Sequence, residues 1–253
     1  MNLGEDHAQT GMIGVEAVGR SKADGYSLGF GPQGQFTIQP HLWKTLSYKV
    51  DDFDFLCQTN ASVFVVATRP NSGFSSLQDV VDAARKQPGK VSFASAEQAT
   101  APHLIAESIG MEKGVQFNHI AFRNVGDMYA LVLAGTVDFI VTTPVLLSTY
   151  KAAKGQALVA DQRLPAYPDV PLLKELGFSR STLPGFIGLY APKGVGNLRA
   201  ACARAVQTAA YRQVSDRIAT PGLHADMPAY TAAIKQDSRD MARLLDALGI
   251  KAE

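Results

Sequence analysis

The chain has 253 residues, 46% of them hydrophobic, so it can bury the core of one large domain or of two smaller ones. Its 24 Lys and Arg residues nearly balance its 23 Asp and Glu residues, and no basic cluster interleaved with aromatic residues points to nucleic-acid binding. No run of about eighteen apolar residues occurs, so we expect no direct insertion into a membrane.

Motifs of several common catalytic and cofactor sites are absent from the sequence. There is no GxxxxGK(S/T) and no GxSxG, so the P-loop and the hydrolase elbow lack their residues. The five histidines are not spaced as metal ligands relative to one another or to a cysteine. We therefore expect neither a metal nor a cofactor.

Two further features concern the cellular compartment. Cys57 and Cys202 lie far apart and form no CxxC pattern, so we expect two buried free thiols rather than a disulfide. The first residues, MNLGEDHAQTG, have neither the charged start and apolar stretch nor the cleavage site of a signal peptide. Taken alone, this predicts a cytoplasmic protein if Met1 is the true start.

Apolar runs rich in β-branched and aromatic residues alternate with helical patterns along the chain. We expect strands at 26–30, 62–68, 91–95, 117–122, 137–142 and 186–191, and helices at 77–86, from 100, at 126–134, 198–219 and 228–248. The run SVFVVAT at 62–68 is typical of a strand covered on both faces, and Tyr26 and Phe30 are expected to fill the core. The alternation predicts an α/β protein with mainly parallel sheets.

The strand–loop–helix unit VSFASAEQATAPHLIAESIG, at 91–110, is the most informative stretch. The first amides of such a helix have no partners within the helix and lie at the positive end of its dipole, so they can hold an anion. The amides expected to do so, with the hydroxyl and amide side chains beside them, belong to Ser95, Ala96, Gln98, Ala99 and Thr100. The alternative is an ordinary N-cap between a buried strand and its helix. We expect His103, in the first turn, to cap or pack rather than to contact a ligand.

Several stretches resemble, in order and spacing, the motifs of one protein family. GMIGVEAVGRSKADGYSLGF resembles GxIGAxxVAxAxPDGYTLL, PHLWKTLSYKVDDFDFL resembles PxLYxxLPYDPxxDFxPV, and PGKVSFASAEQATAPHLIAESIG resembles PGKLxYGSxGxGTxxHLxxELF. AGTVDF, LPAYPDVPLLKELGF and FIGLYAPKGV resemble GGxVDL, LPDVPTxxExGxP and WxGLxAPAGTP. From about residue 11 to residue 250, the chain is thus similar to the substrate-binding proteins of tripartite tricarboxylate transporters, the Bug or TctC-type family.

The resemblance implies a fold, a function and a location. Such proteins have a two-lobed α/β fold of the type II periplasmic-binding-protein kind, with two crossover strands as the hinge. They close over a small carboxylate ligand, deliver it to a membrane permease in the periplasm, and catalyse nothing. Applied to this chain, lobe 1 comprises residues 1–67 and 188–253, and lobe 2 comprises residues 68–187.

The resemblance also extends the candidate site beyond the 91–110 unit. Gln33 and Gly34 align with a loop of lobe 1 that faces the cleft. Arg123 and Asn124 stand in a loop that is commonly YKG, and an arginine there can pair with a carboxylate. Thr142 replaces a frequent Asp after the third strand of lobe 2, which favours a plain carboxylic acid as ligand.

Two departures from the family pattern accompany this assignment. Glu97-Gln98-Ala99 replaces the family's GxG, so side chains stand where glycines let the backbone approach a carboxylate. The family's export signal, first strand and one ligand-gripping loop come before the position of Met1. We therefore interpret the sequence as a shortened version of a longer protein.

Two other functions remain open at the level of sequence. A sensing or regulatory module of the same fold rests on the same closure around an acid, and nothing in the sequence separates it from a transport protein. An α/β enzyme, such as a hydrolase or decarboxylase, is disfavoured because no nucleophile–base–acid set can be read.

Overall fold

The computed structural model describes residues 11–69, 71–96, 98–122, 125–144, 156–164, 167–179, 181, 183, 185–217 and 222–251. The chain forms two compact units: unit 1 comprises Met1–Ser62 and Pro184–Glu253, and unit 2 comprises Val63–Leu183. The lobe boundaries expected from the sequence, after Ala67 and before Gly188, each lie a few residues later in the chain than the corresponding boundary between the two units.

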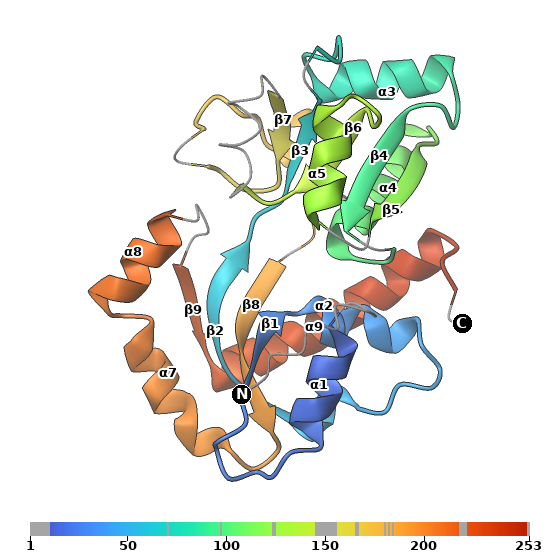
Figure 1. Ribbon diagram of the computed structural model, residues 1–253. Helices are drawn as coiled ribbons and strands as arrows, with labels where there is room; N and C mark the ends of the chain where they lie inside the picture. The colour runs from blue at the N-terminus through green and yellow to red at the C-terminus, as the bar shows by residue number, and fades with distance from the viewer. Residues whose placement is uncertain are drawn as a thin grey trace. The chain divides into compact units, whose positions relative to one another are not determined.

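Unit 2 is built on a five-stranded sheet in the order β5-β4-β6-β3-β7 (Figure 1). Its strands are β3 (Val65–Thr68), β4 (Ser92–Ala96), β5 (Asn118–Phe122), β6 (Phe139–Thr142) and β7 (Gln156–Ala160). Its helices are α3 (Leu77–Lys86), α4 (Ala101–Lys113) and α5 (Val125–Leu133), with a 3-10 turn, η4, at Leu173–Leu176. Strand β4 runs parallel to β5 and β6, whereas β3 runs antiparallel to β6 and β7.

Helices α4 and α5 cover opposite faces of this sheet (Figure 1). On one face, Phe93 of β4 stacks with Phe139 of β6 and with His103 of α4. The neighbouring residues Ala94 and Ile140 point to the other face, where they share a buried cluster with Met128 and other residues of α5. Because successive strand residues alternate between faces, unit 2 has three layers, helix–sheet–helix.

Helix α3 shows how local sequence sets an element of this unit. Ser76 accepts a hydrogen bond from the backbone N–H of Asp79, and the Asp79 carboxylate accepts one from the N–H of Ser76, which is a capping box. The buried face of the helix consists of Leu77, Val80, Val81 and Ala84. The expected span of 77–86 is confirmed, since the cap and the apolar spacing are both local signals.

Unit 1 is built on a four-stranded sheet in the order β1-β8-β2-β9, in which every pair is antiparallel. The strands are β1 (Gly29–Pro32), β2 (Phe53–Ser62), β8 (Gly185–Pro192) and β9 (Gly222–Asp226). The helices are α1 (Met12–Gly19), α2 (Gly34–Thr37), α7 (Arg199–Ala205), α8 (Ala209–Arg217) and α9 (Met227–Ala247), with 3-10 turns η1 (Gln39–His41), η2 (Val50–Asp52) and η5 (Gly196–Leu198). Phe36 is at the centre of the core, in edge contact with the rings of Tyr48, Phe53, Phe55 and Tyr190.

The expectation of mainly parallel sheets is wrong. Of the seven strand pairs described, only two are parallel, and both join strands of the β4–α4–β5–α5–β6 run. A single crossover helix forces the strands it links to run parallel. The other pairs join strands that are linked by longer paths, so the alternation of strands and helices does not determine their direction.

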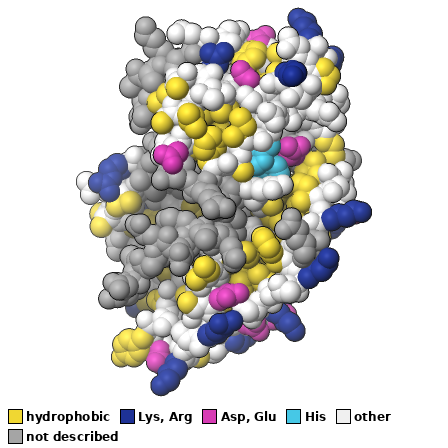
Figure 2. Space-filling model, turned by 45° about the vertical axis from the view of Figure 1, so that its right-hand side comes forward, with side chains coloured by type: hydrophobic (Ala, Val, Ile, Leu, Met, Phe, Trp, Pro, Cys, Tyr) yellow, Lys and Arg dark blue, Asp and Glu magenta, His cyan; other side chains and the backbone are white. Residues whose placement is uncertain are grey.

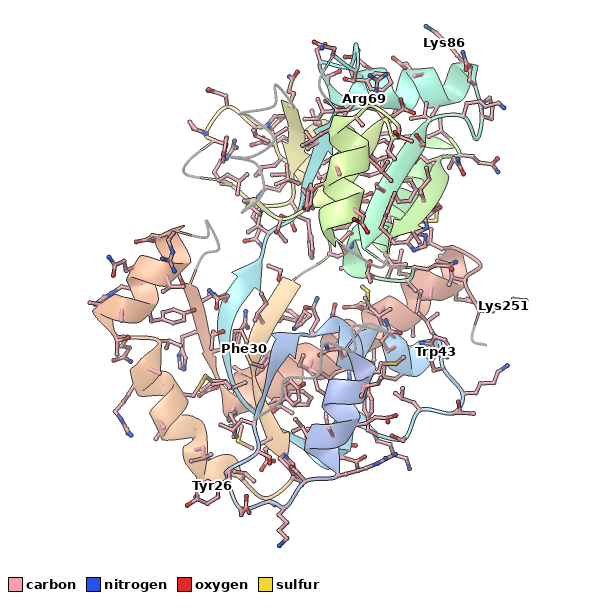
Figure 3. All side chains as sticks on the ribbon, viewed as in Figure 1. Tyr26, Phe30, Trp43, Arg69, Lys86 and Lys251 are labelled. Carbon is pink, nitrogen blue, oxygen red and sulfur yellow. A yellow bond between two sulfur atoms is a disulfide. The ribbon has the colours of Figure 1, made fainter. Side chains whose placement is uncertain are left out.

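The core assignment of Tyr26 and Phe30 is also wrong, since their exposed fractions are 93% and 63% (Figure 3). Strand β1 begins only at Gly29, and the ring of Tyr190 occupies the space where a side chain at Gly29 would lie. Phe30, one residue on, therefore points to the opposite face. The run YSLGF is apolar by composition, but only its glycine side packs on the core.

The two cysteines form a disulfide rather than the two free thiols expected from the sequence. Cys57 of β2 is bonded to Cys202 of α7, with the Cα atoms 6.2 Å apart. A separation of 145 residues leaves no spacing signal in the sequence, and only the packing of α7 on β2 brings the thiols together.

Within the described residues, no helix has the length and apolarity needed to cross a membrane.

Candidate functional site

The loop between β4 and α4 lies at the edge of the unit 2 sheet where three parallel strands end. Strands β4, β5 and β6 point the same way, so the chain leaves them at one edge, after Ala96, Phe122 and Thr142. In open α/β sheets, ligands bind outside the carboxyl ends of the strands. This edge therefore carries most of the site residues expected from the sequence.

Helix α4 begins directly after this loop. Thr100 is its N-cap, with an extended backbone, and its carbonyl accepts the first helical bond from Leu104 N at 3.0 Å. Pro102 lies in the first turn, where the lack of an N–H costs nothing. The N–H groups of Ala101 and His103 precede the helix's own ladder and lie at the positive end of its dipole. The Thr100 side chain does not cap the helix.

Ala99 adopts an unusual backbone conformation, with a φ of 56°. Its N–H donates a hydrogen bond to Nδ1 of His103 at 3.2 Å, within a buried environment. His103 is only 5% exposed, and burial together with the nearby His119 lowers its pKa to about 4. The imidazole is therefore neutral at neutral pH, and because the Ala99 N–H donates to Nδ1, the single ring proton is on Nε2. His103 packs and caps, as the sequence analysis expected.

Ser95 is fully buried at the end of β4, and its Oγ lies 2.8 Å from Nε2 of His119 on β5. Both side chains share the α4 face with Phe93, whose ring stacks on that of His119 at 4.7 Å between centroids. Burial lowers the pKa of His119 to about 4, so this imidazole is also neutral near pH 7. The Ser95 hydroxyl thus supports the loop from within the unit. His119 was not among the site residues predicted from the sequence, because only strand register reveals its pairing with Ser95.

Thr142, at the end of β6, faces the opposite side of the sheet from Ser95. Its Oγ1 is hydrogen-bonded to the phenol of Tyr129 on α5, in a buried environment. Burial raises the pKa of Tyr129, so the phenol keeps its proton. The structure therefore places Ser95 and Thr142 at one edge of the sheet but does not bring their side chains together.

Two other expected residues of the β4–α4 loop are accessible to solvent. Gln98 is exposed, and Thr100 is half-buried. Ala96 ends strand β4. Arg123 and Asn124, the expected partners from the neighbouring loop, lie outside the described residues.

Gln33 and Gly34 belong to unit 1, where they start helix α2. Gln33 is buried, and its Oε1 accepts a hydrogen bond from the N–H of Phe186 on β8 at 2.9 Å. The backbone N–H of Gln33 in turn donates to the carbonyl of Phe186 at 3.0 Å. The side chain expected to contact a ligand thus joins β8 to the start of α2.

A separate pocket of about 530 Å³ lies in unit 2 at the start of β4 and β6, the edge opposite the β4–α4 loop. It is lined by Gly73, Phe74, Asp79, Asp82, Ala83, Lys86, Gln87, Lys90, Val91 and Asp138. Its three carboxylates and two ammonium groups do not favour an anion.

Figure 2 shows basic and acidic side chains scattered over the face of the molecule that it presents. Within the described ranges, no group of three His, Cys, Asp or Glu side chains is placed to hold a metal ion.

The chemistry available at the β4–α4 loop is hydrogen-bond donation without a fixed charge on the described side chains. Backbone amides at the start of α4 and the exposed amide of Gln98 are donors, and both neighbouring imidazoles are neutral. Such donors at a helix N-terminus suit a carboxylate or another small anion.

Comparisons with known proteins identify relatives of the chain. The family described as tripartite tricarboxylate transporter family receptor, TctC, matches residues 5–250. A UPF0065 protein of Bordetella pertussis is 27% identical over 188 residues, which cover 72% of this chain and 58% of that protein. The chain thus spans less than two thirds of the length of that curated relative.

Two solved structures show the same fold. An adipate-bound protein of R. palustris has a TM-score of 0.87 and 16% identity, with 96% of this chain and 85% of that one covered. MatC of Rhodopseudomonas palustris, with bound malate, has a TM-score of 0.78 and 19% identity, with 95% and 85% covered. The expected fold of the periplasmic-binding-protein kind is confirmed.

Proposed function

The chain belongs to the family of tripartite tricarboxylate transporter receptors, and from this membership we propose that it is a solute-binding protein for small organic acids. The ligand class is a di- or tricarboxylate or a related acid. Two proteins that share the fold have adipate and malate bound, respectively. Family membership over residues 5–250 is the observation that carries the proposal.

The β4–α4 loop is the part of unit 2 that we assign to the carboxylate. The N–H groups of Ala101 and His103, the side chain of Gln98 and the hydroxyl of Thr100 are its proposed contacts. The amide of Ala99 and the hydroxyl of Ser95 are bonded to His103 and His119, so these two residues support the loop. Arg123 and Asn124 remain proposed partners from the next loop.

The proposed role is delivery of the acid to a membrane transporter, in the periplasm, without any catalytic step. The Cys57–Cys202 bond supports this location, because disulfides persist in oxidising compartments such as the periplasm. The near balance of 24 Lys and Arg against 23 Asp and Glu, without a basic cluster interleaved with aromatic residues, gives no reason to expect a nucleic-acid partner.

A ligand screen tests the proposal. Malate, adipate, succinate and citrate are added to the protein at millimolar concentration, each matched with its neutral amide, and the thermal transition is followed. An acid at about a hundred times its Kd stabilises the native state by about 2.7 kcal/mol. We expect at least one acid to raise Tm while its amide does not. Equal shifts with acid and amide, no shift with any acid, or turnover of an acid contradicts the proposal.

A further inference from the structure

Two imidazoles lie against each other beneath the β4–α4 loop. The ring centroids of His103 and His119 are 4.1 Å apart. The ring of Phe93 stacks with both, at 6.0 Å from His103 and 4.7 Å from His119. The three rings come from α4, β5 and β4, so they connect the three elements that meet at the proposed carboxylate site.

Each imidazole is bonded to one end of the loop. His119 meets the Ser95 hydroxyl at 2.8 Å, where strand β4 ends. His103 accepts the Ala99 N–H at 3.2 Å, one residue before the N-cap of α4. Ser95 and Ala99 are therefore each bonded to a histidine from within the unit.

Ala99 is the strained point of the loop. Its φ of 56° lies in the left-handed region, which a residue with a Cβ rarely adopts and which glycine adopts freely. The residue is also buried, so the surroundings do not leave it free to relax. The hydrogen bond to His103 acts directly on this peptide and favours the observed conformation.

The same contacts do not form a reactive serine. The Ser95 side chain has no exposed surface, so a substrate has no access to its hydroxyl. Glu107, the acidic group facing His103, lies 3.7 Å from Nε2 on the same helix, and His119 is the titratable group facing it from β5. Burial raises the pKa of Glu107 and lowers that of His103, which favours neutral forms of both.

We infer that His103 is a positioning residue for the carboxylate site: its Nδ1 holds Ala99 in the left-handed conformation and thereby sets the geometry of the loop that leads into α4. The effect of His103 on ligand binding rests on the proposed function. Its effect on the loop does not, because the hydrogen bond to Ala99 exists without a ligand. His103 itself contacts a carboxylate only through its backbone N–H, which a side-chain substitution leaves in place.

A pair of substitutions separates the hydrogen bond from the packing of the ring. His103→Asn keeps an acceptor at the position of Nδ1 but loses ring volume, whereas His103→Leu keeps volume and loses the acceptor. Ala99→Gly is then added to His103→Leu, because glycine adopts a positive φ without support. His224→Leu, on exposed strand β9, is the matched control.

Binding of malate and adipate is measured by calorimetry at pH 7, and exchange of the Ala99 amide by NMR. We expect His103→Leu to weaken binding about tenfold, the factor that corresponds to losing support for one left-handed residue. His103→Asn should retain most of the affinity, and adding Ala99→Gly to His103→Leu should restore most of it. The Ala99 amide should exchange slowly in the wild type and in His103→Asn, and fast in His103→Leu.

Two results overturn the inference. One is that His103→Leu binds like the wild type while His103→Asn does not, since the ring would then act through its volume. The other is that the Ala99 amide exchanges at the same rate in all variants, which would show that the hydrogen bond to His103 does not hold Ala99 in place. If the wild type binds neither acid nor any other of the screen, the proposed function fails, and amide exchange in the same variants still decides the positioning role. If His103→Leu does not fold, folding of the double variant with Ala99→Gly together with slow Ala99 exchange in His103→Asn supports the inference, and fast Ala99 exchange in His103→Asn overturns it.

Discussion

Asp161 is a buried carboxyl group at the point where β7 ends. It is 5% exposed; its Oδ1 accepts the backbone N–H of Phe64 at 2.8 Å, and its Oδ2 has no hydrogen-bond partner in the described structure. Burial, which outweighs the hydrogen bonds it accepts, raises its pKa to about 7. Burial of this carboxyl group therefore lowers the stability of the folded protein at every pH at which the carboxyl is ionised in the unfolded chain.

Asp161→Asn should stabilise the protein increasingly as pH rises. In the wild type the unfolded carboxyl ionises near its usual pKa, while the folded one stays protonated up to about pH 7. Stability is therefore lost between about pH 4 and pH 7, and about 1.4 kcal/mol per pKa unit gives a total near 4 kcal/mol. Asn keeps the Phe64 bond without the charge. Denaturant unfolding at pH 4, 6 and 8 measures the difference between the two proteins.

Asp169→Asn is the control for this series, because Asp169 is exposed on the same unit. Its unfolding curves should follow those of the wild type at every pH. If the gap between Asp161→Asn and the wild type is the same at pH 4 and pH 8, the carboxyl does not titrate as described.

At the residue scale, the sequence predicted the position of the β4–α4 loop better than the roles of its side chains. The N-cap at Thr100 and the packing role of His103 are confirmed, since both follow from residue type at a helix start. Ser95 and Thr142 turned out to point to opposite faces, towards His119 and Tyr129. Those pairings depend on strand register and on helices packed from elsewhere, which no local pattern encodes.

At the scale of single elements, strand β8 depends on a glycine at its contact with β2. A Cβ on Gly188 would lie 2.5 Å from the carbonyl oxygen of Cys57 and 2.6 Å from Cε1 of Tyr230. The first of these atoms is backbone in a neighbouring strand, so it cannot rotate away. The absence of a side chain is what lets β8 and β2 pair at this point.

Gly188→Ala should therefore destabilise unit 1 by about 3 kcal/mol, the upper end of the usual range for overpacking. Gly14→Ala is the opposite case, because nothing lies within 4 Å of its Cβ and Gly14 is exposed on helix α1. That substitution should stabilise the protein by about 0.5–1 kcal/mol. Thermal unfolding of both variants measures the two changes in stability. An equal effect of the two substitutions would show that β8 and β2 can pair with a side chain at position 188.

Elements with strong local signals were predicted with accurate bounds, and elements without them were not. Helix α3, which has its capping box, was predicted over its full span, and the start of α4 was predicted at Thr100, its N-cap. Strand β9 was missed because its residues are almost all exposed and do not alternate. The expected helix at 198–219 is two helices, α7 and α8. Thr208 starts the second by accepting the N–H of Tyr211 at 3.2 Å.

At the scale of the whole molecule, the disulfide joins the two chain segments that make up unit 1. Cys57 belongs to the segment before unit 2 and Cys202 to the segment after it. Closing a loop of 145 residues lowers the entropy of the unfolded chain, and the loop-entropy relation gives about 5 kcal/mol.

Reduction of this bond should destabilise the protein by up to that amount. Unfolding in guanidinium is compared with and without reductant, and the double variant Cys57→Ala/Cys202→Ala serves as control. The variant should unfold at the same denaturant concentration under both conditions. Should reductant leave the unfolding midpoint of the wild type unchanged while the thiols are shown to be reduced, unit 1 does not depend on the bond.

The family was readable from the sequence, because several short motifs keep their order over nearly the whole chain, and the family match over residues 5–250 confirms it. The disulfide and the strand directions were not readable. Both depend on contacts between segments that lie far apart in the chain, such as β2 with β8 and with α7.

The most direct test of the proposed carboxylate site is a titration with malate and adipate, followed through the backbone amide signals of the whole chain. We expect saturable changes concentrated at residues 98–103, with the amides of Ala101 and His103 among the most affected. Changes confined to the pocket beside α3, or no saturable change with either acid or with any acid active in the thermal screen, would contradict the placement of the ligand at the start of α4.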